Sequence, residues 1–363
     1  MPKYHADPAV NSRRRASLTV KGVMKNLSEL KGKQLQDAVN ASRFDPTSAA
    51  GFYESYFLRA NHPTRPLAFW IRYTLFSPKG STDKAEGQLW SIYFDGESSS
   101  ITAIKQSVSL NECAFSRSNL LVRLGQSTLD EKMLRGTAVQ GTHRMSWDLR
   151  YQGDSNPSFL LPLSFYSGGF PKAKALSGIP LADFDGAISV NGQDIEVSRW
   201  RGSQNHNWGL KHTDQYAWGQ VAGFDTHPEA FLECTTARLK VGPFWTPWLT
   251  NVVLRIGQRE IRLNSMVQGF LNKGKYSYFH WSIECRQGPL TISVEIEAPK
   301  NRFVGLAYDD PPGGQKTCLN TKLASCTVCL TEAGHAPMIL HTSSRAAFEI
   351  LTTAYDHGVP ISA

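Results

Sequence analysis

The chain of 363 residues is long enough for two domains of ordinary size, each with its own core. Hydrophobic residues make up 41% and charged residues 19%, which excludes a disordered chain and favours an ordered protein rich in strands. The net charge of +8 is scattered, apart from a basic cluster at 11–17, and is typical of an ordinary solvated surface.

No apolar run is long enough for a secretion signal or for a segment that crosses a bilayer. We therefore expect a cytoplasmic protein, which could touch a membrane from outside as a peripheral protein. Basic and aromatic residues do not alternate along any strand, so we expect no nucleic-acid partner.

Period-two alternation of apolar and polar residues dominates from Gly51 onward and predicts half-buried strands. The clearest segments are 52–60, 67–76, 87–95, 143–151, 186–200, 216–224, 231–241, 250–265, 275–285 and 290–298. Asn191–Gly192 lies between two alternating segments and predicts a tight hairpin turn. So many consecutive antiparallel strands usually hide their edges by closing into barrels, which predicts an all-β fold.

Two segments have the spacing of helices. Residues 343–358 place apolar residues at helical intervals between a serine and Gly358, which predicts a helix that ends the chain. Residues 27–42 predict a shorter helix, although Gly32 weakens it. The irregular stretch from Gly153 to Ile179 is a long connection, and such loops often line or cover a site.

The division into domains follows from these elements. We expect an N-terminal extension at 1–45, a first barrel at 46–225, and a second barrel with the terminal helix at 226–363. The break at Gly223–Ala230 is the candidate boundary between the barrels.

One short stretch, 200–224, combines glycines with aromatic and hydrogen-bonding side chains. In an extended strand Gln204, His206 and Trp208 share one face, and in the next strand Tyr216 and Trp218 share one face. Such a face suits a cavity that holds an apolar ligand and offers a few polar anchors. The alternative is a buried polar network that fixes a barrel corner, and both interpretations stay open.

The motif "SQNHNWG", followed by the strand "YAWG", resembles the carotenoid 1,2-hydratases (hydroxyneurosporene synthases) and their relatives, which include fungal lipocalin-like pericyclases and, more distantly, tocopherol cyclases. The early segment "ESYFLRANHPTRPLAFWIRYTLF" is similar to the first barrel strands of that family. The resemblance implies two lipocalin-like antiparallel β-barrels with a pocket for a polyene or terpenoid. It also implies protonation of an alkene, followed by water capture or ring closure.

The sequence departs from this family at one position. The hydratases are expected to carry a His-Asp-His-Asn arrangement whose acid is the suspected proton donor, whereas here Gln204 and Asn205 stand in its place. Asp214 and Glu54 are the remaining acids near aromatic residues, and Arg72 could form a buried ion pair with Glu54. The candidate catalytic residues are therefore Asp214, Glu54 and His206. The candidate substrate-binding residues are Gln204, Asn207, Trp208, His212, Tyr216, Trp218, Trp70 and Arg72.

Three functions fit these residues. The first is a cofactor-independent cyclase, isomerase or hydratase acting on an apolar isoprenoid or polyene. The second is a carrier that binds such a molecule without changing it, and the third is a pericyclase that works by shaping its substrate. We expect no metal and no cofactor, because the sequence has no phosphate-binding glycine loop and no metal-ligand set. The sequence leaves the oligomeric state open.

Overall fold

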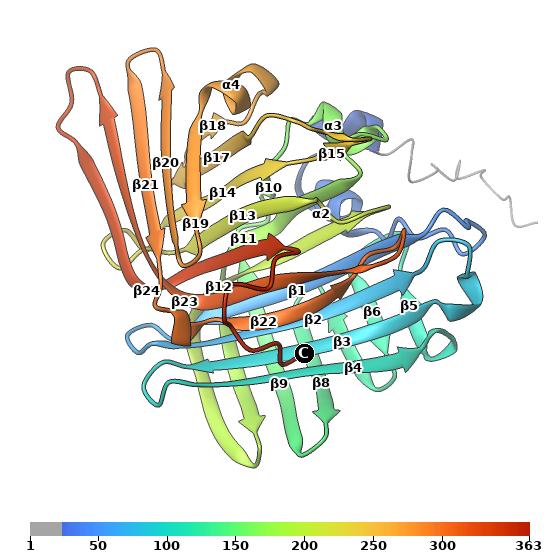
Figure 1. Ribbon diagram of the computed structural model, residues 1–363. Coiled ribbons are helices and arrows are strands. Elements are labelled where there is room, and N and C mark those ends of the chain that lie inside the picture. The colour runs from blue at the N-terminus through green and yellow to red at the C-terminus, as the bar shows by residue number, and fades with distance from the viewer. Residues whose placement is uncertain (1–23) are drawn as a thin grey trace, which may run out of the picture.

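A computed structural model describes residues 24–363, so the basic cluster at 11–17 lies outside the described residues. Antiparallel strands form two large sheets, and the chain passes from the first to the second between Gly209 and Gln215. Figure 1 shows the first sheet (blue to green) lying against the second (yellow to red). This architecture confirms the predicted all-β class with two barrel-like sheets. None of the helices within residues 24–363 is long and apolar enough to cross a membrane.

The first sheet has 12 strands in the order β4-β3-β2-β1-β12-β11-β9-β8-β7-β6-β5, with β10 paired to β11. The strands are β1 (Phe52–Asn61), β2 (Leu67–Ser77), β3 (Glu86–Asp95), β4 (Ser100–Ser109), β5 (Cys113–Phe115), β6 (Leu121–Leu124), β7 (Ser127–Asp130), β8 (Met133–Gln140), β9 (His143–Gly153), β10 (Ser158–Phe159), β11 (Ala173–Val190) and β12 (Gln193–Gly209). The backbone N–H of Lys105 in β4 donates to Gln140 in β8 at 2.7 Å. This cross-link shows that the sheet curls round its core.

The second sheet has 10 strands in the order β18-β17-β14-β13-β24-β23-β21-β20-β19, with β22 paired to β23. The strands are β13 (Gln215–Ala222), β14 (Ala230–Arg238), β17 (Leu249–Ile256), β18 (Arg259–Leu263), β19 (Lys273–Ser277), β20 (His280–Gln287), β21 (Leu290–Glu297), β22 (Val304–Asp309), β23 (Gln315–Glu332) and β24 (Met338–Thr352). A separate hairpin consists of β15 (Lys240–Val241) and β16 (Phe244–Trp245). The side-chain amide of Asn272, the residue before β19, donates to the carbonyls of Thr250 and Leu263, and these bonds hold the start of β19 against β17 and β18.

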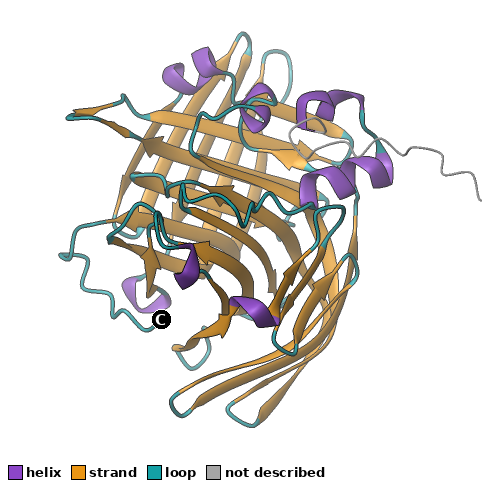
Figure 2. Cartoon of the chain, turned by 90° about the vertical axis from the view of Figure 1, so that its right-hand side faces the viewer, coloured by secondary structure: helices purple, strands orange, loops and turns teal. Residues whose placement is uncertain are grey.

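The helices are short and lie at the edges of the sheets, as Figure 2 shows. They are η1 (Met24–Glu29), α2 (Gly32–Asn40), η2 (Thr82–Lys84), η3 (Leu110–Glu112), α3 (Ser164–Ser167), α4 (Met266–Leu271) and η4 (Lys300–Arg302). Helix α2 confirms the helix predicted within 27–42, and it begins at Gly32, where a positive φ of 51° turns the chain into the helix. It packs beside β11.

The core has one part inside each barrel, one part between the barrels and a smaller part beneath α2. The part between them, which we call the seam, joins the first sheet's Phe57, Trp70 and Trp90 to Trp218 and Leu351 of the second. Both faces of several strands are therefore buried, one against a barrel interior and the other against the neighbouring sheet.

This burial explains why the helix predicted at 343–358 is wrong. Most of that segment belongs to β24, and residues 346–352 are buried without interruption because both faces of the strand are covered. A strand that is buried on both faces carries a continuous apolar run, which hides its period of two and can mimic helical spacing.

The strand pairing also moves the expected border between the barrels. β13 was expected in the first barrel, yet it pairs with β14 and β24 in the second sheet. The break at Gly223–Ala230 is only the turn from β13 to β14, and the real crossing at 210–214 is too short to alter the composition. The hairpin predicted at Asn191–Gly192 is confirmed, with φ of 51° and 88° at its two residues.

Candidate functional site

A cavity lies at the seam, and both sheets contribute to its wall. The first sheet provides Tyr53, Phe57, Trp70, Arg72, Asn205 and Asn207. The second provides Tyr216, Trp218, Glu233, Thr235, Tyr308 and Glu349. The connection between β10 and β11 adds Leu160, Leu161, Pro162, Phe165, Phe170 and Pro171, so the long loop read from the sequence does line this cavity.

Six of the predicted binding residues reach this cavity: Trp70, Arg72, Asn207, His212, Tyr216 and Trp218. His212 stacks between Tyr53, at 4.0 Å between ring centroids, and Tyr308, at 5.6 Å. Burial, together with the nearby charges of Arg72 and Lys316, holds the pKa of His212 well below its ordinary value. The imidazole is therefore a neutral part of an aromatic wall.

Gln204, His206 and Trp208 do share one face of β12, as the alternation predicts, but that face points away from the seam. Gln204 donates to Asn40 of α2 at 3.1 Å, and the Arg43 guanidinium lies 4.1 Å from the centre of the Trp208 ring. The neighbouring Asn205 and Asn207 line the cavity because strand neighbours point to opposite faces. In addition, β12 and β13 belong to different sheets and do not form a hairpin.

Glu54 and His206 form a buried pair beneath α2. His206 Nε2 lies 3.0 Å from Glu54 Oε1, and His206 Nδ1 lies 2.7 Å from the carbonyl oxygen of Val39. The Ser42 hydroxyl and the Arg43 backbone N–H also donate to the Glu54 carboxylate, at 2.6 and 2.9 Å. Burial alone would raise the pKa of Glu54, but the bond from His206 and the charges of His206 and Arg43 lower it. Glu54 is thus held as an anion, outside the cavity.

The predicted pairing of Glu54 with Arg72 does not occur. In the register of β1 and β2, Arg72 lies opposite Phe57, whose side chain faces the seam, while Glu54 lies opposite Leu75. An odd offset along a strand places two side chains on opposite faces of the sheet, which keeps this carboxylate and this guanidinium apart.

Asp214 lies in the crossing between the sheets and is not part of the cavity wall. Its carboxylate lies 2.5 Å from Lys211 Nζ and 3.7 Å from Lys316 Nζ, and it accepts a bond from the backbone of Lys240 at 2.9 Å. These partners outweigh the effect of burial and lower the pKa of Asp214. The carboxyl stays ionised and is poorly suited to donate a proton.

Glu233 on β14 is a carboxyl group in the cavity wall that was not among the acids predicted from the sequence. It is 2% exposed, and no ion pair with it occurs among residues 24–363. Trp218 Nε1 donates to Glu233 Oε1 at 3.2 Å, and Ser177 Oγ lies 3.2 Å from Oε2. Burial raises the pKa of Glu233 to about 7, against the opposing effects of Trp218, Ser177 and Arg59.

A signal for Glu233 was present in the sequence. In "AFLECTTA" Glu233 lies between apolar residues and shares a strand face with Phe231 and Thr235. Glu54 shares its own strand face with aromatic residues in the same way. The sequence could not show which sheet covers this face, or that no side-chain cation among the described residues contacts Glu233 there.

A hydrogen-bond network crosses the seam and fixes the position of the proton on Glu233. An indole N–H can only donate, so Oε1 accepts and the proton of the neutral carboxyl belongs on Oε2, facing Ser177. Ser177 Oγ can then accept this proton and donate to Asn205 Oδ1 at 2.8 Å. Gln220 donates to both Ser177 and Asn205, at 3.0 and 2.8 Å. The network is fully satisfied when Glu233 is neutral.

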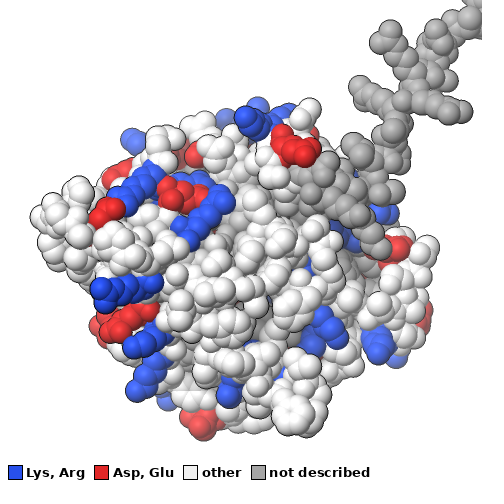
Figure 3. All heavy atoms as spheres, turned by 90° about the horizontal axis from the view of Figure 1, so that it is seen from above, with Lys and Arg blue, Asp and Glu red and all other residues white. Residues whose placement is uncertain are grey.

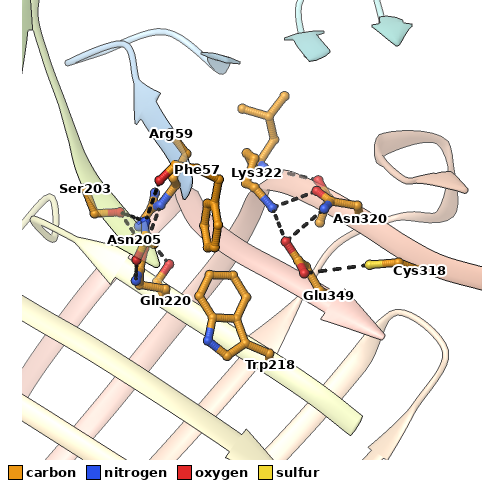
Figure 4. A network of polar contacts seen from close by, with 12 residues as sticks. Phe57, Arg59, Ser203, Asn205, Trp218, Gln220, Cys318, Asn320, Lys322 and Glu349 are labelled. Atoms are coloured by element: carbon orange, nitrogen blue, oxygen red, sulfur yellow. Dashed lines mark hydrogen bonds and ion pairs between the residues drawn. The ribbon is translucent and has the colours of Figure 1, made fainter. Parts of the chain in front are cut away.

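Arg59 fastens this network to the opposite sheet. Its Nε donates to Gln220 Oε1 and its Nη2 to the Gln220 carbonyl, both at 3.0 Å, and its Nη1 donates to the Arg345 carbonyl at 3.1 Å. In Figure 4 this cluster lies on one side of the Phe57 and Trp218 rings, which meet edge to face at 6.0 Å.

A second polar cluster lies on the other side of those rings in Figure 4. Lys322 Nζ is fully buried and lies 2.7 Å from Glu349 Oε1, and Asn320 also donates to that oxygen at 2.8 Å. The ammonium lies 5.6 Å from the centre of the Trp70 ring and 5.8 Å from that of Trp218. The Glu349 carboxylate therefore neutralises this cation within the wall.

Several apolar side chains on segments that adjoin the cavity wall are exposed. Val267 and Leu271 of α4 are 70% and 65% exposed, and Phe244 in the β15–β16 hairpin is 76% exposed. Met266 and Phe170, also exposed, line the cavity itself. Figure 3 looks down on the face that carries α3, α4 and β15, and it shows charged side chains mainly towards the edges of that face.

Comparisons with known proteins support the fold. No protein-family model matches the sequence. Kievitone hydratase from Nectria haematococca has a similar structure, with a TM-score of 0.53 and 11% identity, covering 84% of this chain and 90% of that one. CghA in complex with Sch210972 gives a TM-score of 0.54 at 10% identity, covering 89% and 97%. The chain has the two-barrel fold of these proteins. This is the fold that the resemblance to the hydratase-like lipocalin proteins implied.

Sequence similarity extends to an uncharacterized protein of Mycobacterium tuberculosis, strain H37Rv. The two are 26% identical over 221 residues, which is 59% of this chain and 66% of that protein. The match therefore spans just under two thirds of the relative's length.

Proposed function

We propose that this protein is an enzyme that adds a proton to an apolar, unsaturated isoprenoid or polyene held at the seam, and so hydrates or cyclises it without a cofactor. The observation that carries the proposal is Glu233, a buried carboxyl group in the cavity wall whose pKa of about 7 keeps a large share of it protonated near neutral pH.

The reaction begins with neutral Glu233, whose carboxyl group turns from Ser177 toward the cavity and gives its proton to one carbon of a substrate alkene. The positive charge that develops on the other carbon is captured by water or by a second alkene of the same molecule. The carboxylate then takes back a proton, from the added water or from a neighbouring carbon, so that the enzyme is regenerated. Ser177 and Gln220 hold the carboxyl group in position before this transfer.

The aromatic wall favours this charge. Phe57, Trp70 and Trp218 present π-faces or edges to the cavity, and indole faces stabilise cations best among side chains. The Lys322 ammonium next to two of these rings would oppose a carbocation, but its pairing with Glu349 limits that effect.

The comparisons support this reaction class at the level of the fold. One protein with the same two-barrel architecture is named a hydratase, and another is seen with a bound small molecule. The two other functions that the sequence suggests, a carrier and a shape-driven cyclase, use the same cavity and predict different results in the following test.

The test incubates the purified protein with a panel of polyprenyl and polyene compounds in heavy water, and mass spectrometry measures carbon-bound deuterium in the products. We expect labelled product, and a loss of turnover of about 10²- to 10⁴-fold in Glu233→Gln. Glu295→Gln is the matched control, because Glu295 is exposed on β21 and pairs only with His280 in this structure's described residues.

Each alternative would show itself in that experiment. Unlabelled product that Glu233→Gln still forms would replace acid catalysis with a shape-driven cyclisation. Tight binding with no conversion of any compound would make the protein a carrier.

A further inference from the structure

Arg72 is a buried cation in the cavity wall for which the described residues provide no anion. It is 4% exposed, and no ion pair joins it to any carboxylate within residues 24–363. Nη2 donates to the Ser55 hydroxyl at 2.7 Å, while the buried Nε has no hydrogen-bond partner. A buried charge without a counter-ion is costly, and such groups are normally paired.

Other donors and rings surround this guanidinium. The indole Nε1 of Trp70, two positions earlier on the same face of β2, is also buried without a partner. The guanidinium carbon lies 4.7 Å from the centre of the Tyr308 ring and 5.9 Å from that of Trp70. Two donors without a partner, one of them charged, thus belong to neighbouring side chains of an otherwise aromatic part of the cavity wall.

The other cations of the seam have different partners. Lys322 pairs with Glu349, Arg59 is bonded to Gln220, and Lys174 donates to the carbonyl of Pro171 at 2.6 Å. Among the described residues of the cavity wall, Arg72 is the cationic side chain that has a buried donor without a partner.

We propose that Arg72, assisted by Trp70 Nε1, binds a carboxylate on the substrate, so that the substrate class is an apolar polyene or isoprenoid with a carboxylate at one end. An oxyanion accepts hydrogen bonds from both donors, and a planar guanidinium matches a carboxylate closely. This inference rests on the proposed function for the apolar part of the substrate. It also removes a conflict, because an unpaired Arg72 would repel the carbocation that the proposed reaction requires.

The test measures binding and needs no turnover. The probe is cis-parinaric acid, a fluorescent polyene acid, and its methyl ester is the neutral control. We expect the protein to bind the acid at least about tenfold more tightly than the ester, as a charge-assisted bond predicts. Arg72→Met should abolish this preference and leave the affinity for the ester within about twofold.

Matched variants keep the result interpretable. Lys174→Met removes the other buried cation of the cavity wall and should keep the preference, and so should Glu295→Gln at its exposed site. Arg72→Lys retains a charge and should keep part of the preference, which covers the case in which Arg72→Met does not fold. Equal binding of acid and ester by the unmodified protein would overturn the proposal, as would loss of the preference in Lys174→Met. Neither result bears on Glu233, whose role depends on the deuterium experiment.

Discussion

Glu54 and Glu233 are both buried carboxyl groups on long strands, yet their surroundings are opposite. Glu54 lies beneath α2 and receives bonds from His206, Ser42 and the Arg43 backbone, so its pKa is lowered. Glu233 lies at the seam with only neutral donors in contact, so its pKa is raised to about 7. The difference teaches that burial on an apolar face does not identify an acid catalyst. The charge of the partners decides whether the buried carboxyl group is a fixed anion or a proton donor.

The sharpest way to break this comparison is to remove Glu54. Glu54→Ala leaves His206, the Ser42 hydroxyl and the Arg43 backbone N–H without their acceptor, and we expect the free energy of unfolding to fall by about 3–5 kcal/mol. Urea denaturation followed by circular dichroism measures the loss. Glu295→Ala, at an exposed site, should change it by less than about 1 kcal/mol. If Glu54→Ala were equally mild, the pair would not anchor α2.

The next effect concerns the titration of Glu233. Its pKa is raised from 4.5 in the unfolded chain to about 7 in the folded protein, so its contribution to stability is full below about pH 4.5. As the pH rises towards 7 the unfolded chain ionises first, and stability falls by up to about 3 kcal/mol in total. Unfolding measured across this range should show that slope, and Glu233→Gln should lack it. An identical slope in both proteins would contradict the raised pKa.

The substitution Trp218→Phe tests how far one neutral donor lowers the pKa of Glu233, and its expected effect is smaller. The variant keeps an aromatic ring but removes the indole N–H that stabilises the Glu233 carboxylate at 3.2 Å. The pKa of Glu233 should therefore rise further, by up to about one unit. Infrared difference spectra during a pH titration, referenced to Glu233→Gln, follow the protonated carboxyl directly. A fall in its pKa would show that Trp218 is not its main donor.

Asp214→Asn should have the smallest effect. Asp214 is partly exposed, pairs with Lys211 and lies outside the cavity wall, so we expect a loss of stability of about 1 kcal/mol or less. Binding of cis-parinaric acid should be unchanged. A large loss of binding in this variant would restore Asp214 as a site residue.

The strands could be predicted from the sequence because most of them are covered on one face and alternate accordingly. The prediction failed at β24, where both faces are buried and the alternation is lost. The hairpin turn at Asn191–Gly192 could be predicted because it depends on two adjacent residues. The crossing from one sheet to the other could not be predicted, since it depends on which distant strands pair.

The site was predicted in part for the same reason. Trp70, Tyr216 and Trp218 stood out as aromatic residues on strand faces, and the structure places all three in the cavity wall. Sequence alone could not tell which face of β12 meets the second sheet, so His206 was expected in the cavity although it lies beneath α2. Glu233 carried the same local signal as Glu54. Only the three-dimensional distribution of cations separates the two.

The hydrogen bonds of Arg59 across the seam affect how the shape of the cavity can change. The Arg59 guanidinium donates to the side-chain oxygen and to the backbone carbonyl of Gln220, and Gln220 in turn positions Asn205 in the cavity wall. Directional bonds of this kind set the spacing of the two barrels, whereas apolar packing alone would permit sliding. A substitution at Arg59 would alter which molecules fit without touching a lining residue. Selection for a new substrate can therefore act on the joint between the barrels, and the two halves of the chain have to evolve together.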